Sequence, residues 1–497
     1  MNRFVEVVPL SLTPLTPIHI GCGEDFEPTN YVIDGGVLYH FEPARLSLTP
    51  ADRRRLIECA NEKADDAIRA VQRFFHAKRA ECQRVSRLRV PVAAGVAAWY
   101  ERRVGQVAQR DAGGRTVSSQ LEIERTAHHP HTGKPYLPGS SLKGSVRTGW
   151  LNDLDKGPPV RRDPGQRPTE RSADLEADFL GGSFASDPFR LVDVADASSP
   201  DLQSRVVFAV DRRKQPRRDG KEKDLFVRRE AISGGQLYGL RGEVRFKSLQ
   251  ASARPPHGPS ADKRIGDFAS LARACNGFYL QRLNADLATL RMLCADRWID
   301  DFERLIDSLK PALDEGRAMI LRVGRHSGAE SVTLERQRSI LIRGGRERGS
   351  SWQREATTIW LAAEHEDSIN ELRPFGWLLV ERAGNPPGEH LRRWCEAEAK
   401  AFAEPAAPEP PATLRAPETA AGSVTVWRQA RLQYNRQNRT LTAIGPGNAR
   451  ANALDPRGDE LLSNLPEEIQ QKVRTNQFVR VVARVRSADL IDVDVMA

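Results

Sequence analysis

Strand-like and helix-like patterns of hydrophobic residues alternate along most of the chain. Apolar and polar residues alternate over Phe4–Leu12, which predicts an opening strand. The pair Thr49-Pro50 is typical of a helix start, and apolar residues then recur at helical spacing up to about Cys82. A second helical pattern, with one break, runs from Lys263 to about Leu313. Strands and helices interleaved in this way predict an α+β fold.

Turn signals and low-complexity stretches divide the chain into candidate domains. Tyr31–Phe41 predicts a short hairpin that turns at Asp34-Gly35-Gly36. A Ser/Ala/Pro-rich stretch at about 250–260 is the candidate boundary between two domains, and the Pro/Ala-rich stretch 404–422 predicts an extended linker. The predicted divisions are an N-terminal domain with a helical insertion (1–250), a C-terminal domain (251–403), the linker (404–422), and a small β-rich module (423–497) with one helix at Leu465–Val473 and a closing strand at Phe478–Val485.

The composition favours an ordinary globular protein that stays in the cytoplasm. Hydrophobic residues make up 39% of the chain and charged residues 28%. No run of eighteen apolar residues occurs, so no membrane span is expected, and the first residues lack the features of a secretory signal. The six cysteines lie far apart without a C-x-x-C pair. This spacing argues against structural zinc and disulfides, and predicts reduced thiols.

Positive charge is in excess and is clustered. The chain has 75 Lys and Arg against 66 Asp and Glu, a net charge of +9. Residues 205–229 hold ten Lys or Arg against four acids, and residues 321–348 hold seven Arg against three Glu. Counterion release from an RNA backbone favours binding at such clusters. The alternative is that both are solvated loops, and the excess charge alone does not decide between them.

The segment Pro138–Thr148 predicts a helix start suited to a phosphate. A Pro-Gly turn precedes two serines able to cap a helix, and two cations follow within the first turns. Free backbone N–H groups and the positive end of the helix dipole would add to these cations. An ordinary capped helix explains the same residues equally well. The residues of interest are Gly139, Ser140, Ser141, Lys143 and Arg147.

Two glycine-rich loops suit close approach to a sugar-phosphate chain, because glycine lacks a Cβ and tolerates positive φ. Neither loop has the spacing of a Walker A motif or of a dinucleotide fingerprint, and tight turns are the alternative explanation. The first loop contains Gly21 and Gly23, and the second contains Gly324 and Gly328 flanked by Arg322, Arg325 and His326.

The histidines are the candidate chemical groups. His19 lies between Ile18 and Ile20, and a histidine in such an apolar setting is expected to make structural hydrogen bonds. The cluster of histidines at 128–131 is typical of a polar loop, since no second pair of metal ligands lies nearby in sequence. The sequence therefore predicts no metal site, no cofactor and no catalytic residue.

Four segments, taken in their order along the chain, resemble segments of one protein family; the most informative one is described first. Pro138–Thr148 is similar to the P-G-S-S-L-K-G-x-x-R segment of the RAMP proteins of CRISPR systems. Thr16–Glu24, continuing to Tyr31–Asp34, resembles the opening of one RAMP family, the capping subunit of the type III-A (Csm) effector complex at the 3′ end of the crRNA. Leu321–Leu334 resembles that family's second glycine-rich segment, and Pro374–Trp377 follows it. The resemblance covers roughly residues 1 to 400.

The resemblance implies two tandem ferredoxin-like (RRM-like) RAMP domains with helical insertions, in addition to the β-rich module. It implies a non-catalytic RNA-binding subunit that caps the crRNA 3′ end and assists crRNA maturation and complex assembly in antiviral defence. The implied partners are the crRNA, the backbone RAMP subunit, the other type III-A subunits and host exonucleases. The implied RNA contacts are Gly21, Gly23, Gly139, Ser140, Ser141, Lys143, Arg147, Arg322, Gly324, Arg325, His326 and Gly328.

Two other functions remain open at the level of sequence. RAMP-related processing nucleases use a histidine for RNA cleavage without metal, so His19 or His326 is a candidate general acid or base in an endoribonuclease that processes the crRNA precursor. The chain is also a candidate for an assembly scaffold that contacts protein alone.

Overall fold

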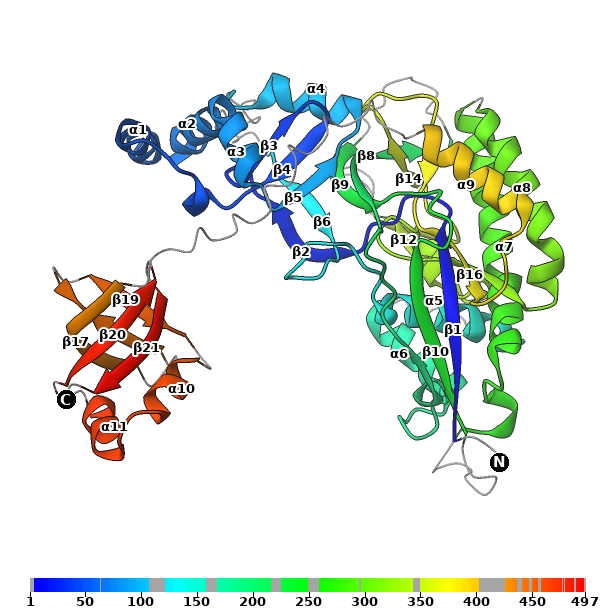
Figure 1. The fold of residues 1–497 in the computed structure, drawn as a ribbon. Coiled ribbons are helices and arrows are strands. Elements are labelled where there is room, and N and C mark those ends of the chain that lie inside the picture. The colour runs from blue at the N-terminus through cyan, green and yellow to red at the C-terminus, as the bar shows by residue number, and fades with distance from the viewer. Residues whose placement is uncertain are drawn as a thin grey trace. The chain divides into compact units, whose positions relative to one another are not determined.

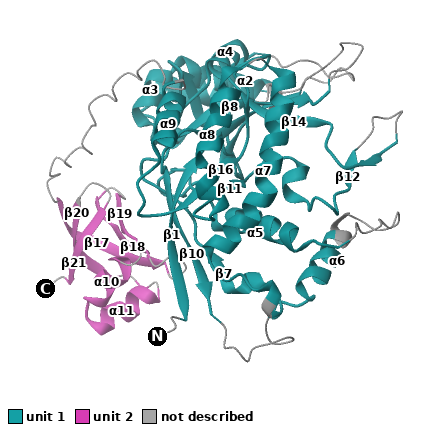
Figure 2. Ribbon diagram, turned by 90° about the vertical axis from the view of Figure 1, so that its right-hand side faces the viewer, with its two compact units in different colours: residues 1–407 teal, residues 408–497 magenta. Residues whose placement is uncertain are grey.

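The computed structural model divides the chain into two compact units, residues 1–407 and 408–497 (Figure 2). The expected linker at 404–422 and most of the expected boundary at 250–260 lie outside the described residues, so the predicted domain divisions stay predictions. The structure describes residues 4–62, 64–106, 121–157, 168–215, 225–248, 259–294, 296–342, 349–401, 425–435, 440–446, 449–454, 457–475, 477, 479–486 and 489–495.

A five-stranded antiparallel sheet lies at the centre of the first unit (Figure 1). Its central strand β1 (Val5–Pro14) pairs with β10 (Leu240–Lys247) from Val5↔Lys247 to Leu12↔Leu240, and with β16 (Trp377–Arg382) on its other side. The alternating pattern of β1 buries Leu10 and Leu12, as an opening strand with one core face requires. In sheet order the strands are β11 (Ala318–Arg322), β16 (Trp377–Arg382), β1 (Val5–Pro14), β10 (Leu240–Lys247) and β7 (Val192–Val194).

Helices α5 (Gly139–Leu154) and α7 (Phe268–Leu293) pack on one face of this sheet. Leu142 and Val146 of α5, and Leu271 of α7, meet the sheet residues in one continuous hydrophobic core. The predicted long helical region is confirmed, with its break between α7 and α8 (Arg297–Asp314). The same unit also contains α4 (Ala94–Arg103), α6 (Pro168–Leu180) and α9 (Glu389–Ala401), in addition to the N-terminal helices described below.

The chain passes directly from the first sheet into a second, six-stranded sheet. Strand β1 of the first sheet is followed, after a short passage at 15–20, by β2 (Gly21–Phe26) of the second. All its pairings are antiparallel except the one between β6 and β9. In sheet order the strands are β15 (Arg373–Pro374), β14 (Thr358–Ala363), β8 (Ser204–Arg213), β9 (Leu225–Ile232), β6 (Ile123–Thr126) and β2 (Gly21–Phe26).

The predicted helix start at Thr49-Pro50 and the predicted hairpin at 31–41 are both confirmed. The Thr49 hydroxyl accepts a hydrogen bond from the backbone N–H of Asp52 at 3.1 Å, so it caps the first helix of this region. The elements here are β3 (Tyr31–Asp34), β4 (Val37–His40), α1 (Pro50–Ala60), α2 (Ala64–Ala77), α3 (Arg79–Val85) and β5 (Leu88–Pro91), while β12 (Ile340–Ile342) and β13 (Ser351–Gln353) form a separate pair.

The second unit is a closed five-stranded barrel with its own hydrophobic core. The predicted helix at 465–473 is confirmed as α11 (Glu467–Arg474), but a second helix that the sequence pattern did not predict, α10 (Arg457–Ser463), precedes it. The strand predicted at Phe478–Val485 is present as β20 (Arg480–Arg486), but it does not close the module, because β21 (Asp489–Val495) follows it. The elements are β17 (Thr425–Asn435), β18 (Thr440–Ile444), β19 (Arg450–Ala453), α10 (Arg457–Ser463), α11 (Glu467–Arg474), β20 (Arg480–Arg486) and β21 (Asp489–Val495).

The predicted mixture of helices and sheets is therefore confirmed as a fold class, while the tandem ferredoxin-like arrangement remains a proposal. Across the part of the chain that the structure describes, no helix has the length and apolar character needed to cross a bilayer.

Candidate nucleic-acid interface

The passage from β1 to β2 brings the two glycine-rich loops together. The backbone of Ile18 pairs with Ile232 of β9, which holds the passage against the second sheet. One residue later, the carbonyl oxygen of His19 accepts a hydrogen bond from the backbone N–H of Arg325 at 2.8 Å. The prediction of a loop at Gly21 and Gly23 is wrong, because both residues belong to strand β2, whose pairing with β6 shifts register between Gly21 and Asp25. This first glycine-rich segment, still called the first loop below, lies beside the second, which follows β11, although the two are far apart in sequence.

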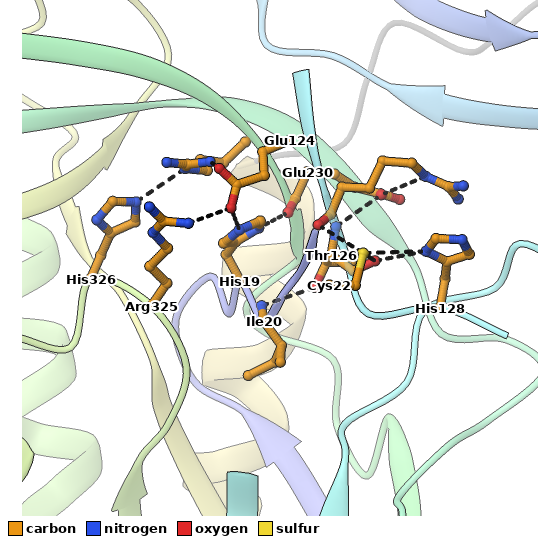
Figure 3. Close-up of polar contacts among 11 residues, drawn as sticks. His19, Ile20, Cys22, Glu124, Thr126, His128, Glu230, Arg325 and His326 are labelled. Atoms are coloured by element: carbon orange, nitrogen blue, oxygen red, sulfur yellow. Dashed lines mark hydrogen bonds and ion pairs between the residues drawn. The ribbon is translucent and has the colours of Figure 1, made fainter. Parts of the chain in front are cut away.

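Glu124 forms the centre of a charged cluster at this meeting point (Figure 3). Strand β6 pairs Glu124 with Arg229 of β9, and these two side chains form an ion pair. The second oxygen of the Glu124 carboxylate lies 2.5 Å from Nη1 of Arg325 and 3.4 Å from Nε2 of His19. Arg229 is buried, whereas the Arg325 side chain is 55% exposed. Arg325 is therefore the member of the cluster that offers a cation to the surface.

His19 is fully buried and neutral at pH 7. Its Nδ1–H donates to the backbone carbonyl oxygen of Glu230 at 2.7 Å, which leaves the Nε2 lone pair facing Glu124. Burial lowers the pKa of His19 to about 4, and the nearby Arg229 and Arg325 contribute to the lowering. The contact with Glu124 is consequently an ion pair only below that pH. The prediction that His19 makes structural hydrogen bonds is confirmed.

His326 lies on the other side of Arg229 and is also neutral at pH 7. Its Nε2 accepts a hydrogen bond from Nε of Arg229 at 3.2 Å, and its ring packs against Trp360 and Phe375. Burial, followed by the charge of Arg229, lowers its pKa to about 3. The ring centroids of His19 and His326 are 6.5 Å apart. Neither imidazole carries the proton that a general acid would donate at neutral pH.

A second polar group adjoins the cluster at β2 and β6 (Figure 3). His128 donates from Nδ1 to the carbonyl oxygen of Thr126 at 2.9 Å, and its Nε2 lies 3.3 Å from the Glu24 carboxylate. The Cys22 sulfur is 4.0 Å from the same Nδ1, but burial raises the pKa of the thiol. Because Nδ1 already donates to a carbonyl, His128 is not placed to take a proton from Cys22. No group of three or more potential metal-ligating side chains occurs among the described residues.

The start of α5 differs from the predicted capped helix. The N-cap residue is Pro138, and neither serine caps the helix, because the helix already begins at Gly139. The backbone N–H of Gly139 instead donates to the carboxylate of Asp196 at 2.7 Å, so an acid of the protein itself lies at this helix end. A Cβ at position 139 would lie 2.2 Å from the carbonyl oxygen of Val194, which is why this close approach needs glycine.

The remaining expected contacts occupy different environments. Ser140 is exposed, Ser141 and Lys143 are half-buried, and Arg147 of the same helix pairs with Asp187 at 2.8 Å and Glu176 at 3.0 Å. Of the loop residues, Gly21 and Gly324 lie within the cluster, Gly23 has open space around it, and Gly328 precedes the short 3₁₀ turn at Ala329–Val332.

Arg322 is the residue whose surroundings differ most from the expectation. Its side chain is 4% exposed, and its Nη1 lies 2.7 Å from the Asp286 carboxylate. The backbone carbonyl oxygen of Arg322 accepts a hydrogen bond from the Ser145 hydroxyl at 2.9 Å. In this conformation the guanidinium faces the interior rather than a ligand.

A pocket of about 380 Å³ borders the later turns of α5. Leu151, Leu175 and Phe179 form its apolar wall, and Arg147 and Arg338 also line it. Gly144 is the first residue of α5 that lines the pocket. The pocket therefore lies away from the start of α5, where the sequence predicted a phosphate site.

The ion pair between Glu124 and Arg229 is the part of the candidate site that the sequence did not predict. Arg229 belongs to the basic stretch at 205–229, but nothing in a strand sequence marks Glu124 until the fold shows what faces it. Four further cations of that stretch, Arg217, Arg218, Lys221 and Lys223, lie outside the described residues.

The pKa of His19 predicts a loss of stability in weak acid. A pKa lowered from 6.5 to about 4 means that the unfolded chain binds this proton more readily than the folded one. The stabilising effect is complete above pH 6.5 and is lost as the pH falls toward 4. Between pH 7 and pH 5 the free energy of unfolding should fall by about 2 kcal/mol more in the natural chain than in His19→Gln. Urea unfolding, followed by tryptophan fluorescence, measures this difference. His40, whose pKa burial also lowers to about 4, stays in both proteins. Parallel pH profiles would contradict the prediction.

Known proteins of one family match this chain. Residues 11–271 match the model of a family described as the RAMP superfamily. Two curated proteins from strains of Mycobacterium tuberculosis, each named CRISPR system Cms protein Csm5, are 28% identical over 162 residues, which is 31% of this chain and 41% of each relative. The match thus spans about two fifths of the length of these relatives.

Two solved structures are similar at lower identity. One is a chain of a cryo-EM structure of a Csm-crRNA-target RNA ternary complex in a type III-A CRISPR-Cas system, with 16% identity, a TM-score of 0.44, and coverage of 76% of this chain and 100% of that one. The other is the crystal structure of T.onnurineus Csm5, with 16% identity, a TM-score of 0.41, and coverage of 74% and 99%.

Proposed function

This chain belongs to the RAMP superfamily, and on that premise we propose that it is a non-catalytic RNA-binding subunit of a type III-A CRISPR interference complex. It would cap the 3′ end of the crRNA and assist 3′-end maturation and complex assembly. Support comes from the curated relatives named Csm5 and from the four matching segments in their expected order.

One observation carries the RNA-binding part of the proposal. The two glycine-rich loops meet through the hydrogen bond from Arg325 N–H to the carbonyl oxygen of His19. Beside this contact lie Gly21, where a Cβ would be 3.8 Å from Nη1 of Arg325, and the half-exposed Arg325 itself. Glycine backbone next to a cation suits an RNA phosphate, which would replace Glu124 as the partner of Arg325. Of the expected contact residues, the loop members are therefore the leading candidates.

The charge state of the histidines supports a binding role over a catalytic one. Cleavage by acid–base catalysis needs one protonated and one neutral group at the working pH. The pKa values of about 4 and about 3 leave both His19 and His326 neutral at pH 7, and His19 is fully buried. Their proximity nevertheless keeps the metal-independent processing endoribonuclease as the alternative that an experiment must exclude.

The finer expectations belong to the same proposal. The chain would consist of two ferredoxin-like domains side by side within residues 1–403, and it would dock on the backbone RAMP subunit and neighbouring type III-A subunits. Host exonucleases would trim the RNA that extends beyond it. RNA contacts of Gly139 and Arg147 would require displacement of the acids that now bind them, Asp196 at the helix start and Asp187 and Glu176 at Arg147. Ser140, Ser141 and Lys143 would contact RNA from the same helix.

Binding and cleavage of a labelled crRNA precursor test the proposal in one experiment. We expect the full chain to bind without cleaving, in EDTA and in Mg²⁺, with an affinity that falls steeply as salt rises. Arg325→Ala should weaken binding about fivefold at 0.1 M salt and lower the salt slope by about 0.7, which is the share of one phosphate contact on single-stranded RNA.

Arg291→Ala is the matched control, because Arg291 on α7 is 46% exposed and also pairs with carboxylates. Equal losses of RNA affinity in Arg325→Ala and Arg291→Ala would mean that only the net charge of the chain matters, and not the position of Arg325. Absence of RNA binding by the unaltered chain would favour a scaffold that contacts protein alone, and unchanged affinity in Arg325→Ala would show that the Glu124 cluster is not the RNA contact. Discrete cleavage in EDTA that disappears in His19→Ala would establish the processing nuclease instead.

A further inference from the structure

The barrel of the second unit has a specific strand order. Its neighbours run β17-β18-β19-β21-β20, and β20 pairs with β17 to close the ring. The pair β19 and β21 is parallel, and every other pair is antiparallel. Both helices lie between the third and fourth strands in sequence. A five-stranded barrel ordered first, second, third, fifth, fourth, with a helical insertion before the fourth strand, has the topology of the OB-fold.

The helices close one end of this barrel (Figure 1). Leu461 and Leu462 of α10 and Val473 of α11 join the core formed by the inward side chains of the strands. The Tyr434 hydroxyl of β17 donates to Asp459 of α10, and Arg474 of α11 lies over the Tyr434 ring. The helices thus occupy one end, while the outer face of the first three strands stays at the surface.

The outer face of β17, β18 and β19 carries two rows of side chains. Strand register aligns Arg431, Ile444 and Arg450 in one row across the three strands. The next outward row consists of Gln433, Thr442 and Asn452. The residues between these rows, Leu432, Ala443 and Ala451, are buried in the core.

The charges of the barrel are segregated by strand. The arginines Arg428, Arg431 and Arg450 lie on β17 and β19 and are exposed, and β17, β18 and β19 contain no acid. Acids lie on the helices and on β21, where Asp492 and Asp494 pair with Arg484 of the neighbouring β20. A positive field therefore covers the first three strands and is balanced elsewhere within the barrel.

We propose that this face of the barrel, formed by β17, β18 and β19, is a second RNA site that binds single-stranded RNA through its backbone. OB-folds bind oligonucleotides on the face centred on their second and third strands. Here the arginines lie on either side of the uncharged second strand, on β17 and β19. The arginines would contact phosphates. The Thr442 hydroxyl donates to Oδ1 of Asn452 at 2.8 Å, which leaves the Asn452 amide N–H groups to donate to a sugar 2′-OH.

The aromatic residues of the barrel indicate how such a site would read RNA. The half-buried Trp427 ring lies against Gly445, where a Cβ would be 2.4 Å from the ring, and Tyr434 faces the helices. Among the described residues, β18 and β19 contribute no ring on which a base could stack. Binding would accordingly be tolerant of sequence and strongly dependent on salt.

Photo-crosslinking on the full chain tests this site separately from the first unit. The probe is an oligouridylate of about ten nucleotides, within the length that one OB-fold holds, with 4-thiouridine as the crosslinking base. We expect adducts on β17, β18 or β19 in the unaltered chain. This result tests the site even if a variant fails to fold. Arg431→Ala with Arg450→Ala should weaken capture at the barrel about 25-fold at 0.1 M salt, or about fivefold for each arginine removed from a phosphate.

The control removes the same charge from the helices, with Arg457→Ala and Lys472→Ala, and should leave the barrel adducts unchanged. Adducts confined to the first unit, or an equal loss in the control, would overturn the barrel site. Because all these variants keep Arg325, that failure would leave the proposed capping role standing. Conversely, barrel adducts that persist when Arg325→Ala abolishes binding by the first unit would support this site alone.

Discussion

Asp286→Ala is expected to lower the free energy of unfolding of the first unit by about 3–5 kcal/mol, because it leaves a buried cation without its partner. The Asp286 carboxylate lies 2.7 Å from Nη1 of Arg322 and accepts a hydrogen bond from the Trp377 indole at 3.3 Å. Arg322 is 4% exposed, and its guanidinium lies over the Trp377 ring. Solvent cannot replace the lost charge without opening the core between α7 and β11.

The matched control is Asp300→Ala, which removes an acid of α8 from a half-exposed pair with Arg291, near the C-terminal end of α7. An exposed pair of this kind contributes about 0–1 kcal/mol. Urea unfolding of both variants supplies the comparison, and similar losses would show that Arg322 does not depend on Asp286. The result also bears on RNA binding, since Arg322 immediately precedes the second glycine-rich loop. If this arginine supports the loop from within, Asp286→Ala should weaken RNA binding without touching the surface.

Gly324→Ala is expected to destabilise the first unit more than Gly23→Ala, although both glycines have nearly the same backbone conformation. Their φ angles are +84° and +79°, which an alanine adopts at a cost of about 1–2 kcal/mol. A Cβ at Gly324 would lie 2.4 Å from the carbonyl oxygen of His19, whereas a Cβ at Gly23 meets nothing within 4 Å. The crowding should add about 1–3 kcal/mol at Gly324 alone.

The crowded carbonyl is also the acceptor for the Arg325 N–H, so the substitution separates the two loops. Thermal and urea unfolding measure the stability difference, and crRNA binding measures its consequence for the interface. Gly23→Ala should retain the stability of the junction and most of its affinity. Equal destabilisation by Gly324→Ala and Gly23→Ala would mean that the contact between Gly324 and the His19 carbonyl can widen without cost. The two loops would then not be held together as the structure indicates.

Local signals allowed much of the fold to be predicted from sequence. The Thr49 cap, the hairpin at 31–41, the break between the two long helices, and the helix at 465–473 each depend on a few neighbouring residues. The start of α5 was predicted less well. Its serines matched a capping pattern, but Asp196, which is distant in sequence, supplies the acceptor instead. A local pattern cannot reveal a competing partner from another segment.

The sequence by itself determined the fold class, the family, the positions of the glycine loops and the excess of positive charge, because these depend on composition, local backbone preference and short motifs. The tertiary structure alone decided which charges face the surface and which face the interior. Packing between distant strands placed Glu124 against Arg229 and Arg325, buried Arg322 on Asp286, and lowered the pKa values of His19 and His326. It also decided the strand order of the barrel, where the parallel pairing of β19 with β21 joins segments on either side of two helices. Desolvation and strand pairing act between residues far apart in the chain, so no local pattern encodes them.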